Sequence, residues 1–233
     1  MDSNQLAIGI AWYVVFIFST TAHEAAHAWV AMRGGDLTAY EGGQVSLDPT
    51  PHIRRSPIGM VIVPILSFLL GGYMMGWASA PYDPTWARAH PHRAARMALA
   101  GPIANLVLAI LAGISIRSGI AMGVFEFPTR LGFTHLVDGP GEGIIPALAL
   151  FASLMFSMNL LLFILNMVPL PPLDGSSAIG LLMSEESANR VQDFMEQPML
   201  AMFGIMGAFI LIGRIFGPVF FAAVGWLYPE LVA

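Results

Sequence analysis

The sequence predicts an all-α polytopic membrane protein, and three observations support this fold class. Of its 233 residues, 56% are hydrophobic and only 11% are charged, and the mean hydropathy is +0.70; in soluble domains about a quarter of the residues are charged. Several apolar segments are long enough to cross a bilayer core of about 30 Å as helices. No linker, repeat or low-complexity stretch divides the chain, so residues 1–233 are expected to form a single membrane domain.

The composition also excludes several classes of function. The chain has no cysteine, so it has no disulfides, thiolate ligands or cysteine nucleophiles, and a bound metal must be held by nitrogen and oxygen atoms. The formal net charge of −5 is spread over short loops without a basic patch, which argues against a nucleic-acid partner. Membrane lipids are the surroundings that the apolar segments require.

The first apolar segment, about residues 6–32, is predicted to be a transmembrane helix. It is too long for a signal peptide and lacks a basic start and a small-residue cleavage site, so we expect it to remain in the mature protein. Gly34 and Gly35 end the helix, and Arg33 marks the membrane face at which it ends.

Two histidines and a glutamate lie together near the C-terminal end of this helix. Ionisable residues among lipid tails are costly unless they are paired or functional. Because residues four apart share one helix face, the imidazoles of His23 and His27 can point at a single ion. Glu24 is placed to hold and deprotonate a water that the metal activates. The alternative interpretation is a hydrogen-bonded polar patch between helices.

The segment after the first helix changes character. Residues 37–50 alternate in polarity around Glu41, Gly42 and Gly43, which predicts a short β-hairpin with a glycine turn. The alternative is an irregular surface loop. The edge strand of such a hairpin could hold an extended peptide through main-chain hydrogen bonds.

Residues 58–77 are apolar but interrupted by Pro64 and two glycines. Arginines flank this segment on both sides, at 54–55 and again at 88–96, and the positive-inside rule places both flanks on the cytoplasmic side. A full crossing would put one flank on the wrong side. We therefore expect a re-entrant or interfacial hairpin, covered by protein where its backbone is irregular.

The remaining apolar segments continue the membrane pattern. Two further transmembrane helices are predicted, at about residues 94–116 and 144–167, joined by a loop on the far side of the membrane. The last apolar stretch, about 199–228, is interrupted by Gly213–Arg214 and Gly217–Pro218. It is therefore either one kinked span or a hairpin.

A proline-rich turn brings a carboxylate into the membrane region. The three prolines within 169–172 cannot continue a helix, so the backbone must unwind and deliver Asp174 from a turn that begins a short helix over about 175–183. Among the acidic residues, Asp174 is the only one besides Glu24 with apolar, helix-breaking surroundings. A catalytic zinc site takes three protein ligands, so we assign Asp174 as the third ligand of one Zn²⁺. Its alternative role is to cap the short helix.

Three motifs occur in an order typical of one family: HEAAH at residues 23–27, LAGPIAN at 99–105 and NMVPLPPLDG at 166–175. They resemble the site-2 protease family of intramembrane zinc metalloproteases, over roughly residues 20–183. The resemblance implies a catalytic core of three transmembrane helices with additional membrane segments. It also implies that His23, His27 and Asp174 hold zinc and that Glu24 is the general base.

Two asparagines match the same family pattern. Asn105 and Asn166 occupy the Gly-Pro-x-x-Asn and Asn-x-x-Pro elements. A buried amide can donate to a developing oxyanion or hold an unwound substrate backbone, which predicts a catalytic or substrate-contacting role. The alternative is a hydrogen bond that joins helices, as asparagine often makes in membranes.

The predicted function is that of an intramembrane zinc endopeptidase. Its partner would be a transmembrane protein or peptide, cleaved in or near its membrane segment, with the active site nearer the cytoplasmic face. Two alternatives use the same residues. One is a membrane metal transporter with a His/His/Asp site, and the other is an inactive family member that acts as a chaperone.

Overall fold

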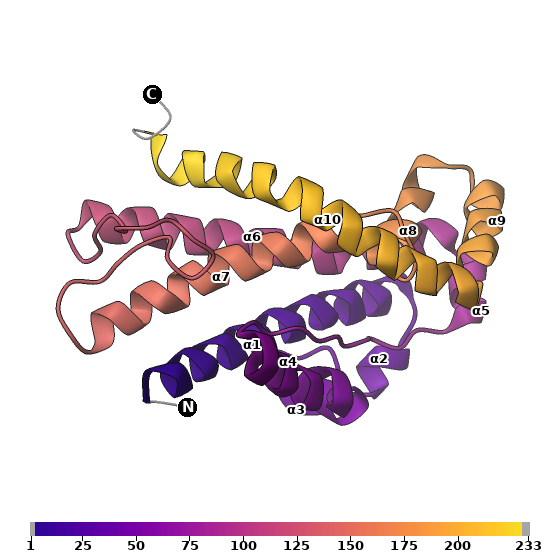
Figure 1. The fold of residues 1–233 in the computed structure, drawn as a ribbon. Coiled ribbons are helices and arrows are strands. Elements are labelled where there is room, and N and C mark those ends of the chain that lie inside the picture. The colour runs from indigo at the N-terminus through magenta and orange to yellow at the C-terminus, as the bar shows by residue number, and fades with distance from the viewer. Residues whose placement is uncertain (1–2, 230–233) are drawn as a thin grey trace.

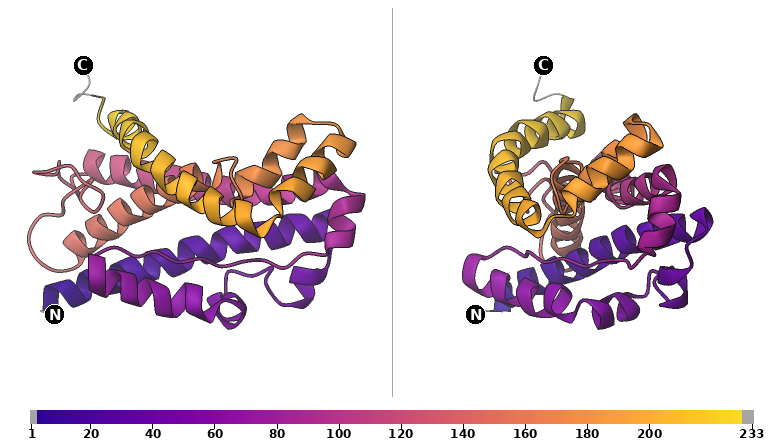
Figure 2. Two further views of the ribbon diagram at one scale, coloured as in Figure 1. Left: turned by 45° about the vertical axis from the view of Figure 1, so that its right-hand side comes forward. Right: turned by 90° about the vertical axis from the view of Figure 1, so that its right-hand side faces the viewer.

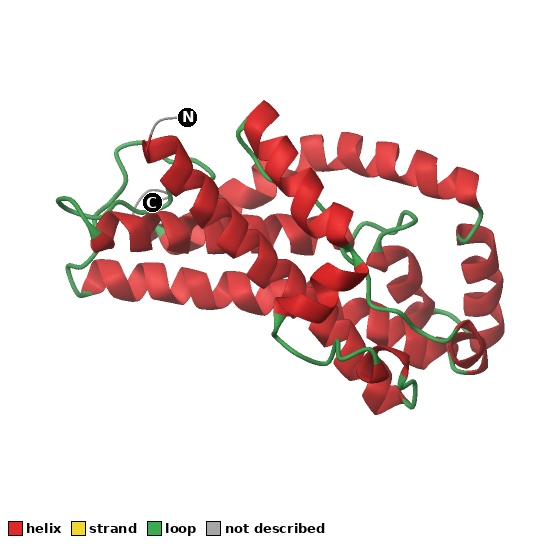
Figure 3. Cartoon of the chain, turned by 90° about the horizontal axis from the view of Figure 1, so that it is seen from below, coloured by secondary structure: helices red, strands yellow, loops and turns green. Residues whose placement is uncertain are grey.

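The computed structural model describes residues 3–229, and its regular structure is helical (Figures 1 and 3). The long helices are α1 (Ser3–Gly34), α6 (Pro91–Ala121), α7 (Ile144–Asn166) and α10 (Pro198–Leu227). The short elements are α2 (Thr38–Glu41), α3 (Pro49–Arg55), the π-helical turn η1 (Ile58–Ile62), α4 (Val63–Gly71), α5 (Pro84–Ala89), α8 (Asp174–Ala178), the 3₁₀ turn η2 (Ile179–Leu182) and α9 (Glu185–Met195).

The four long helices are long and apolar enough to cross a membrane. The shortest, α7, has 23 residues, which at ~1.5 Å per residue reach about 35 Å and exceed the ~30 Å bilayer core. The all-α fold with several membrane-spanning helices, predicted from the sequence, is confirmed on length and composition. In two views α10 lies on one side of the bundle, and α3 and α4 lie on the other (Figures 1 and 2).

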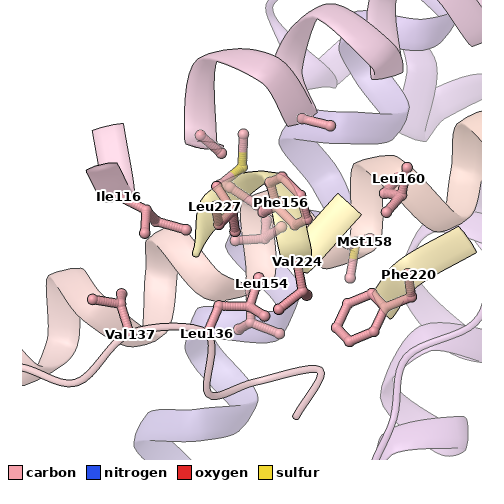
Figure 4. Close-up of a cluster of buried hydrophobic side chains, with 14 of the residues drawn as sticks. Ile116, Leu136, Val137, Leu154, Phe156, Met158, Leu160, Phe220, Val224 and Leu227 are labelled. Atoms are coloured by element: carbon pink, nitrogen blue, oxygen red, sulfur yellow. The ribbon is translucent and has the colours of Figure 1, made fainter. Parts of the chain in front are cut away.

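The hydrophobic core lies in the half of the bundle away from the C-terminal end of α1. There Leu154 and Phe156 of α7 belong to one buried cluster with Ile116 of α6 and Val224 of α10 (Figure 4). Within a membrane such a cluster is stabilised by close packing rather than by removal from water. Gly113 of α6 is buried at this contact, and its lack of a side chain lets the helices approach closely.

α10 is one continuous helix, so the alternative of a hairpin over 199–228 is wrong. Pro218 lies inside it, which membrane helices tolerate because neighbouring groups satisfy the freed backbone carbonyl. In its N-terminal half, α10 rests on the proline-rich loop. A Cβ atom on Gly204 would lie 1.8 Å from the main-chain oxygen of Pro171. α10 therefore packs directly on the segment that leads to Asp174.

We expect Gly204→Ala to destabilise the protein. Alanine favours a helix by about 1 kcal/mol over glycine, but here its methyl group would overlap the main-chain oxygen of Pro171. Overpacking of this kind costs about 1–3 kcal/mol. The thermal unfolding midpoint in detergent should fall, whereas Gly217→Ala, at a helical position with open space around it, should not lower it. Equal midpoints for the two variants would contradict the described packing.

The β-hairpin predicted for residues 37–50 is wrong. The described residues contain no β-strand, and this segment holds α2 and the start of α3 (Figure 3). The reason is local hydrogen bonding by two aspartates, of which Asp48 is the N-cap of α3. The Asp36 carboxylate accepts hydrogen bonds from N and Oγ1 of Thr38 at 2.9 and 2.6 Å, and that of Asp48 accepts from Thr50 N at 2.9 Å. Such side-chain bonds start helical turns and compete with a strand ladder.

Residues 58–77 form a helical leg, η1 and α4, followed by an extended return leg. The chain bends by 112° between α3 and Ile58–Gly71. The two legs are joined where Trp77 N donates to the main-chain oxygen of Gly59 at 3.1 Å. Gly59 permits this contact, because a Cβ atom there would lie 2.2 Å from the main-chain oxygen of Trp77. This is the hairpin form that we predicted; its depth in the membrane stays a prediction.

The loop between α6 and α7 folds back into the bundle. Leu136 is fully buried, and the ring of Phe133 stacks on Trp12 of α1 with centroids 5.4 Å apart. The same Phe133 ring stacks on Phe220 of α10 at 6.4 Å. This end of the bundle, opposite the C-terminal end of α1, is therefore filled with apolar side chains.

Candidate metal centre

Two histidines of α1 lie side by side. His23 and His27 are each 7% exposed, and their Nε2 atoms are 2.9 Å apart. The four-residue spacing explains this, because residues one helical turn apart share a face. Both imidazoles therefore present the same ring atom to one point inside the bundle.

Asp174 comes to this point from a distant part of the chain. After α7 ends, the proline-rich loop returns toward α1, and Asp174 begins α8. Its Oδ2 atom lies 3.0 Å from Nε2 of His23 and 3.3 Å from Nε2 of His27. Gly175 makes this tight return possible, because a Cβ atom there would lie 2.6 Å from two main-chain oxygens of the loop.

Hydrogen bonds on the other ring nitrogens orient both imidazoles. His23 Nδ1 donates to Oδ1 of Asn105 at 2.6 Å, and His27 Nδ1 donates to the main-chain oxygen of Met97 at 2.7 Å. Neither acceptor carries a hydrogen to give, so both Nδ1 atoms hold a ring hydrogen, and in the neutral rings both Nε2 atoms present a lone pair. Metal-ligating histidines require this arrangement.

When both imidazole rings are neutral, three electron-pair donors thus face one point. Asp174 Oδ2 is buried and has no hydrogen-bond partner in the described residues, and with the two Nε2 atoms it forms a group that can hold a metal ion. Their separations of 2.9, 3.0 and 3.3 Å are close to the edge of a tetrahedron around zinc, about 3.3 Å for bonds of ~2.0 Å. The residues therefore fit the predicted single Zn²⁺.

α6 passes directly beside this group because it has a glycine there. A Cβ atom on Gly101 would lie 2.4 Å from Nε2 of His27 and 2.5 Å from Nε2 of His23. Those are the two nitrogen atoms that face the metal position. The space for an ion thus exists only while residue 101 has no side chain.

We expect Gly101→Ala to weaken zinc binding by at least about 10-fold, the smaller of the effects seen when a metal site loses its support. The added methyl group would push the imidazoles off the shared point, although alanine favours the helix itself by about 1 kcal/mol. Zinc affinity is measured by competition with a chelator. Gly213→Ala, at a helical glycine with open space around it, is the control. Unchanged affinity in Gly101→Ala would show that the ion is held elsewhere.

A cavity of about 410 Å³ adjoins the group, and Glu24, His27 and Asp174 line it. Its other walls include the extended segment before α5, the proline-rich loop, and parts of α5, α6, α8, α9 and α10. Glu24 is 6% exposed, so its carboxylate is largely shielded from bulk water. Partial burial, with a further contribution from the negative charge of Glu196, raises the pKa of Tyr82 at the same cavity. Tyr82 is therefore a neutral hydrogen-bond donor.

The two predicted asparagines lie in different environments. Asn105 is fully buried, and besides His23 it contacts Asn159, whose Oδ1 accepts from Asn105 Nδ2 at 2.8 Å. Asn166 ends α7, half-buried, and its side chain makes no hydrogen bond within the described residues. It is not among the residues that line the cavity. The structure thus brings Asn105, but not Asn166, to the metal centre.

Asn159 belongs to this network although it is part of none of the three motifs. It is fully buried in α7. The signal that points to it is its position in the apolar run of residues 154–163 (LMFSMNLLLF). A polar amide at that depth must find a partner inside the protein.

The fold and the site define a class, that of helical membrane proteins with a buried His–His–Asp group that fits one metal ion. The chain belongs to peptidase family M50, the site-2 protease family, whose family model matches residues 11–211. The resemblance based on the three motifs is therefore confirmed.

The relatives carry names that agree with this family. The chain is 30% identical over 163 residues to "Putative zinc metalloprotease YwhC" of Bacillus subtilis, and the match covers 70% of this chain and 64% of YwhC. It is 27% identical over 213 residues to "Putative zinc metalloprotease Rip2" of Mycobacterium tuberculosis, and the match covers 91% of this chain and 71% of Rip2. The chain thus spans just under two thirds of the length of YwhC. No solved structure matches the chain.

Proposed function

We propose that the protein is an intramembrane zinc endopeptidase that hydrolyses peptide bonds in or near the transmembrane segments of other membrane proteins. The observation that carries this proposal is the convergence of His23, His27 and Asp174 on one point, beside a cavity that Glu24 also lines. Membership of a peptidase family and the names of the relatives support metalloprotease chemistry. The three converging residues would hold one Zn²⁺.

Glu24 would carry the proton transfers. When bound here, Zn²⁺ supplies a Lewis acid that polarises the peptide carbonyl and lowers the pKa of water. The Glu24 carboxylate would take a proton from the attacking water and give it to the leaving amine nitrogen. His23 and His27 are already fixed by hydrogen bonds on Nδ1, so they need no reorientation during the reaction.

The extended segment before α5 is suited to hold the substrate chain. Ala78, Ser79 and Ala80 line the cavity next to the metal centre. The main-chain oxygen of Ser79 is fixed by Gln44 Nε2 at 3.3 Å and by Arg55 Nε at 3.1 Å. Main-chain groups of such a segment can pair with a peptide that has unwound from its helix. This segment would take the role that we expected of the hairpin.

We also propose that the metal centre lies near the cytoplasmic face. Arginines favour cytoplasmic loops, and most arginines of the chain lie at or next to the elements of this end of the bundle: Arg33, Arg54, Arg55, Arg88, Arg93, Arg96 and Arg190. Hydrogen bonds connect several of them to these elements, as from Arg93 to the main-chain oxygen of Gly34 at 3.1 Å.

A metal transporter with the same ligands would need a polar path to both membrane faces. The end of the bundle opposite the metal centre is instead filled by the stacked rings of Trp12, Phe133 and Phe220. The phenyl rings of that packing supply no hydrogen-bonding groups of the kind that a hydrated ion requires. This packing favours a hydrolase over a transporter.

The test is cleavage of single-span peptides by the purified protein in liposomes. The peptides carry a Gly-Pro break near one end of the span, and uninterrupted polyleucine spans are the control. We expect cleavage of the first set, its loss on zinc chelation and its recovery when zinc is returned. Zinc binding without cleavage would favour the inactive chaperone, and zinc flux across the liposome membrane would favour the transporter.

A further inference from the structure

We propose that Asn159 is a positioning residue, which fixes through Asn105 the ring nitrogen that His23 presents to the metal. His23, Asn105, Asn159 and Ser19 form one hydrogen-bonded network among α1, α6 and α7. Their exposed fractions are 7% for His23 and 0% for the other three. The inference rests on the metal site of the proposed function and not on peptide cleavage.

The donor-to-acceptor direction of these hydrogen bonds is set by a main-chain carbonyl, which can only accept hydrogen bonds. Asn159 Nδ2 donates to the main-chain oxygen of Met155 and to Oγ of Ser19, both at 2.8 Å. The other end of the amide, Oδ1, therefore faces Asn105 and accepts from its Nδ2 at 2.8 Å. Asn105 is left with Oδ1 toward His23, where it accepts from Nδ1 at 2.6 Å.

Asn105 could not determine this direction without support. The two ends of an amide have nearly the same shape, and only their hydrogen-bonding partners distinguish them. If the Asn105 amide were reversed, its Nδ2 would face Nδ1 of His23. That nitrogen would then have to accept, and the ring hydrogen would move to Nε2, the atom that must face the metal.

Asn159 opposes this reversal because it would set two amide oxygens against each other in a buried place. A longer hydrogen bond from Asn105 Nδ2 to the main-chain oxygen of Ser19, at 3.4 Å, acts in the same direction. His27 needs no such relay, because its Nδ1 donates directly to the main-chain oxygen of Met97. Loss of Asn159 should therefore affect His23 and spare His27.

Zinc affinity, measured by chelator competition, separates this role from simple attachment of one helix to another. Asn159→Leu should weaken zinc binding about 10–100-fold, the usual effect of losing an outer partner of a metal ligand. Asn159→Asp keeps an oxygen toward Asn105 and should bind zinc much more tightly than Asn159→Leu. Ser157→Ala removes a buried hydroxyl of α7 that has no hydrogen bond in the described residues and should bind zinc as the wild type does.

A double variant provides the decisive comparison. In Asn159→Leu/Asn105→Asp, the new carboxylate presents an oxygen to His23 whichever way it is turned, so zinc affinity should return toward the wild-type value. If Asn159 only held helices together, the added Asn105→Asp substitution would not restore zinc affinity. Weak binding that persists in the folded double variant would overturn the proposal, as would wild-type affinity in folded Asn159→Leu.

The nitrogen resonances of His23 test the same claim without metal and without any variant at 159. In metal-free protein labelled with ¹⁵N-histidine, at a pH where the rings are neutral, Nδ1 of His23 should show the shift of a protonated nitrogen. A hydrogen on Nε2 of His23 would overturn the proposal even if Asn159→Leu did not fold. Because none of these readouts uses cleavage, their failure is distinct from failure of the proposed protease activity.

Discussion

The Glu24→Gln variant is expected to keep its zinc and to lose peptide cleavage by about 10²–10⁴-fold, the usual contribution of a general acid–base group. Glutamine has nearly the shape of glutamate but cannot take the proton of a water molecule. The contacts among His23, His27 and Asp174 do not involve residue 24, so the metal should remain. Zinc content and initial cleavage rate are measured on the same preparation.

Glu185→Gln is the matched control for this variant. Glu185 is an exposed carboxylate in the first turn of α9, at the same end of the bundle but not among the residues lining the cavity. Its replacement removes the same charge and should leave cleavage unchanged. If Glu24→Gln cleaved as fast as this control, Glu24 would have no part in the proton transfers.

Asp174→Ala is expected to remove the zinc itself, and cleavage with it. Without the carboxylate, two imidazole lone pairs remain at a buried point, and two ligands do not complete a zinc site. The loss of affinity should exceed the roughly 10–100-fold cost of losing an outer partner. Zinc per chain after dialysis against a weak chelator, together with competition affinity, measures this effect.

Asp193→Ala distinguishes loss of the ligand from general loss of negative charge. Asp193 pairs with Arg88 at the surface, and both side chains are at least half exposed, so this variant should keep zinc and activity. Full zinc occupancy in Asp174→Ala, equal to that of Asp193→Ala, would mean that the proline-rich loop does not supply a ligand.

The parts of the site that follow from short-range geometry could be predicted from the sequence. The spacing of His23 and His27 fixes one helix face, and a carboxylate after three prolines has to leave a helix at a defined place. Both inferences depend on the chain within a few residues of the side chain concerned. The apolar spans could be predicted for the same reason, because length and composition alone decide whether a helix can cross a bilayer.

The hairpin prediction for residues 37–50 is wrong because two local signals conflict there. The alternation of polarity suggests strands, but the Asp48 carboxylate caps α3 and the Asp36 carboxylate holds a turn just before α2. An isolated two-stranded hairpin has little stability of its own, so these local hydrogen bonds are enough to decide the outcome.

The role of Asn159 could not be predicted because it depends on contacts between helices. Its partners Ser19 and Asn105 lie 140 and 54 residues away in the chain, and no spacing rule connects them. The alternatives for residues 199–228 stayed open for a related reason. The packing of Gly204 on Pro171, which orients that helix, is a contact between distant segments.

X-ray absorption at the zinc edge of the purified protein tests the central claim most directly, since it reports the ligands of the ion itself. The structure predicts one zinc per chain with only nitrogen and oxygen neighbours, at about 2.0–2.2 Å, including two imidazoles. In His23→Ala and His27→Ala the imidazole signal should fall or the zinc should be lost. Zinc absent from the wild-type protein, or an ion whose imidazole shell is the same in both variants, would contradict the account.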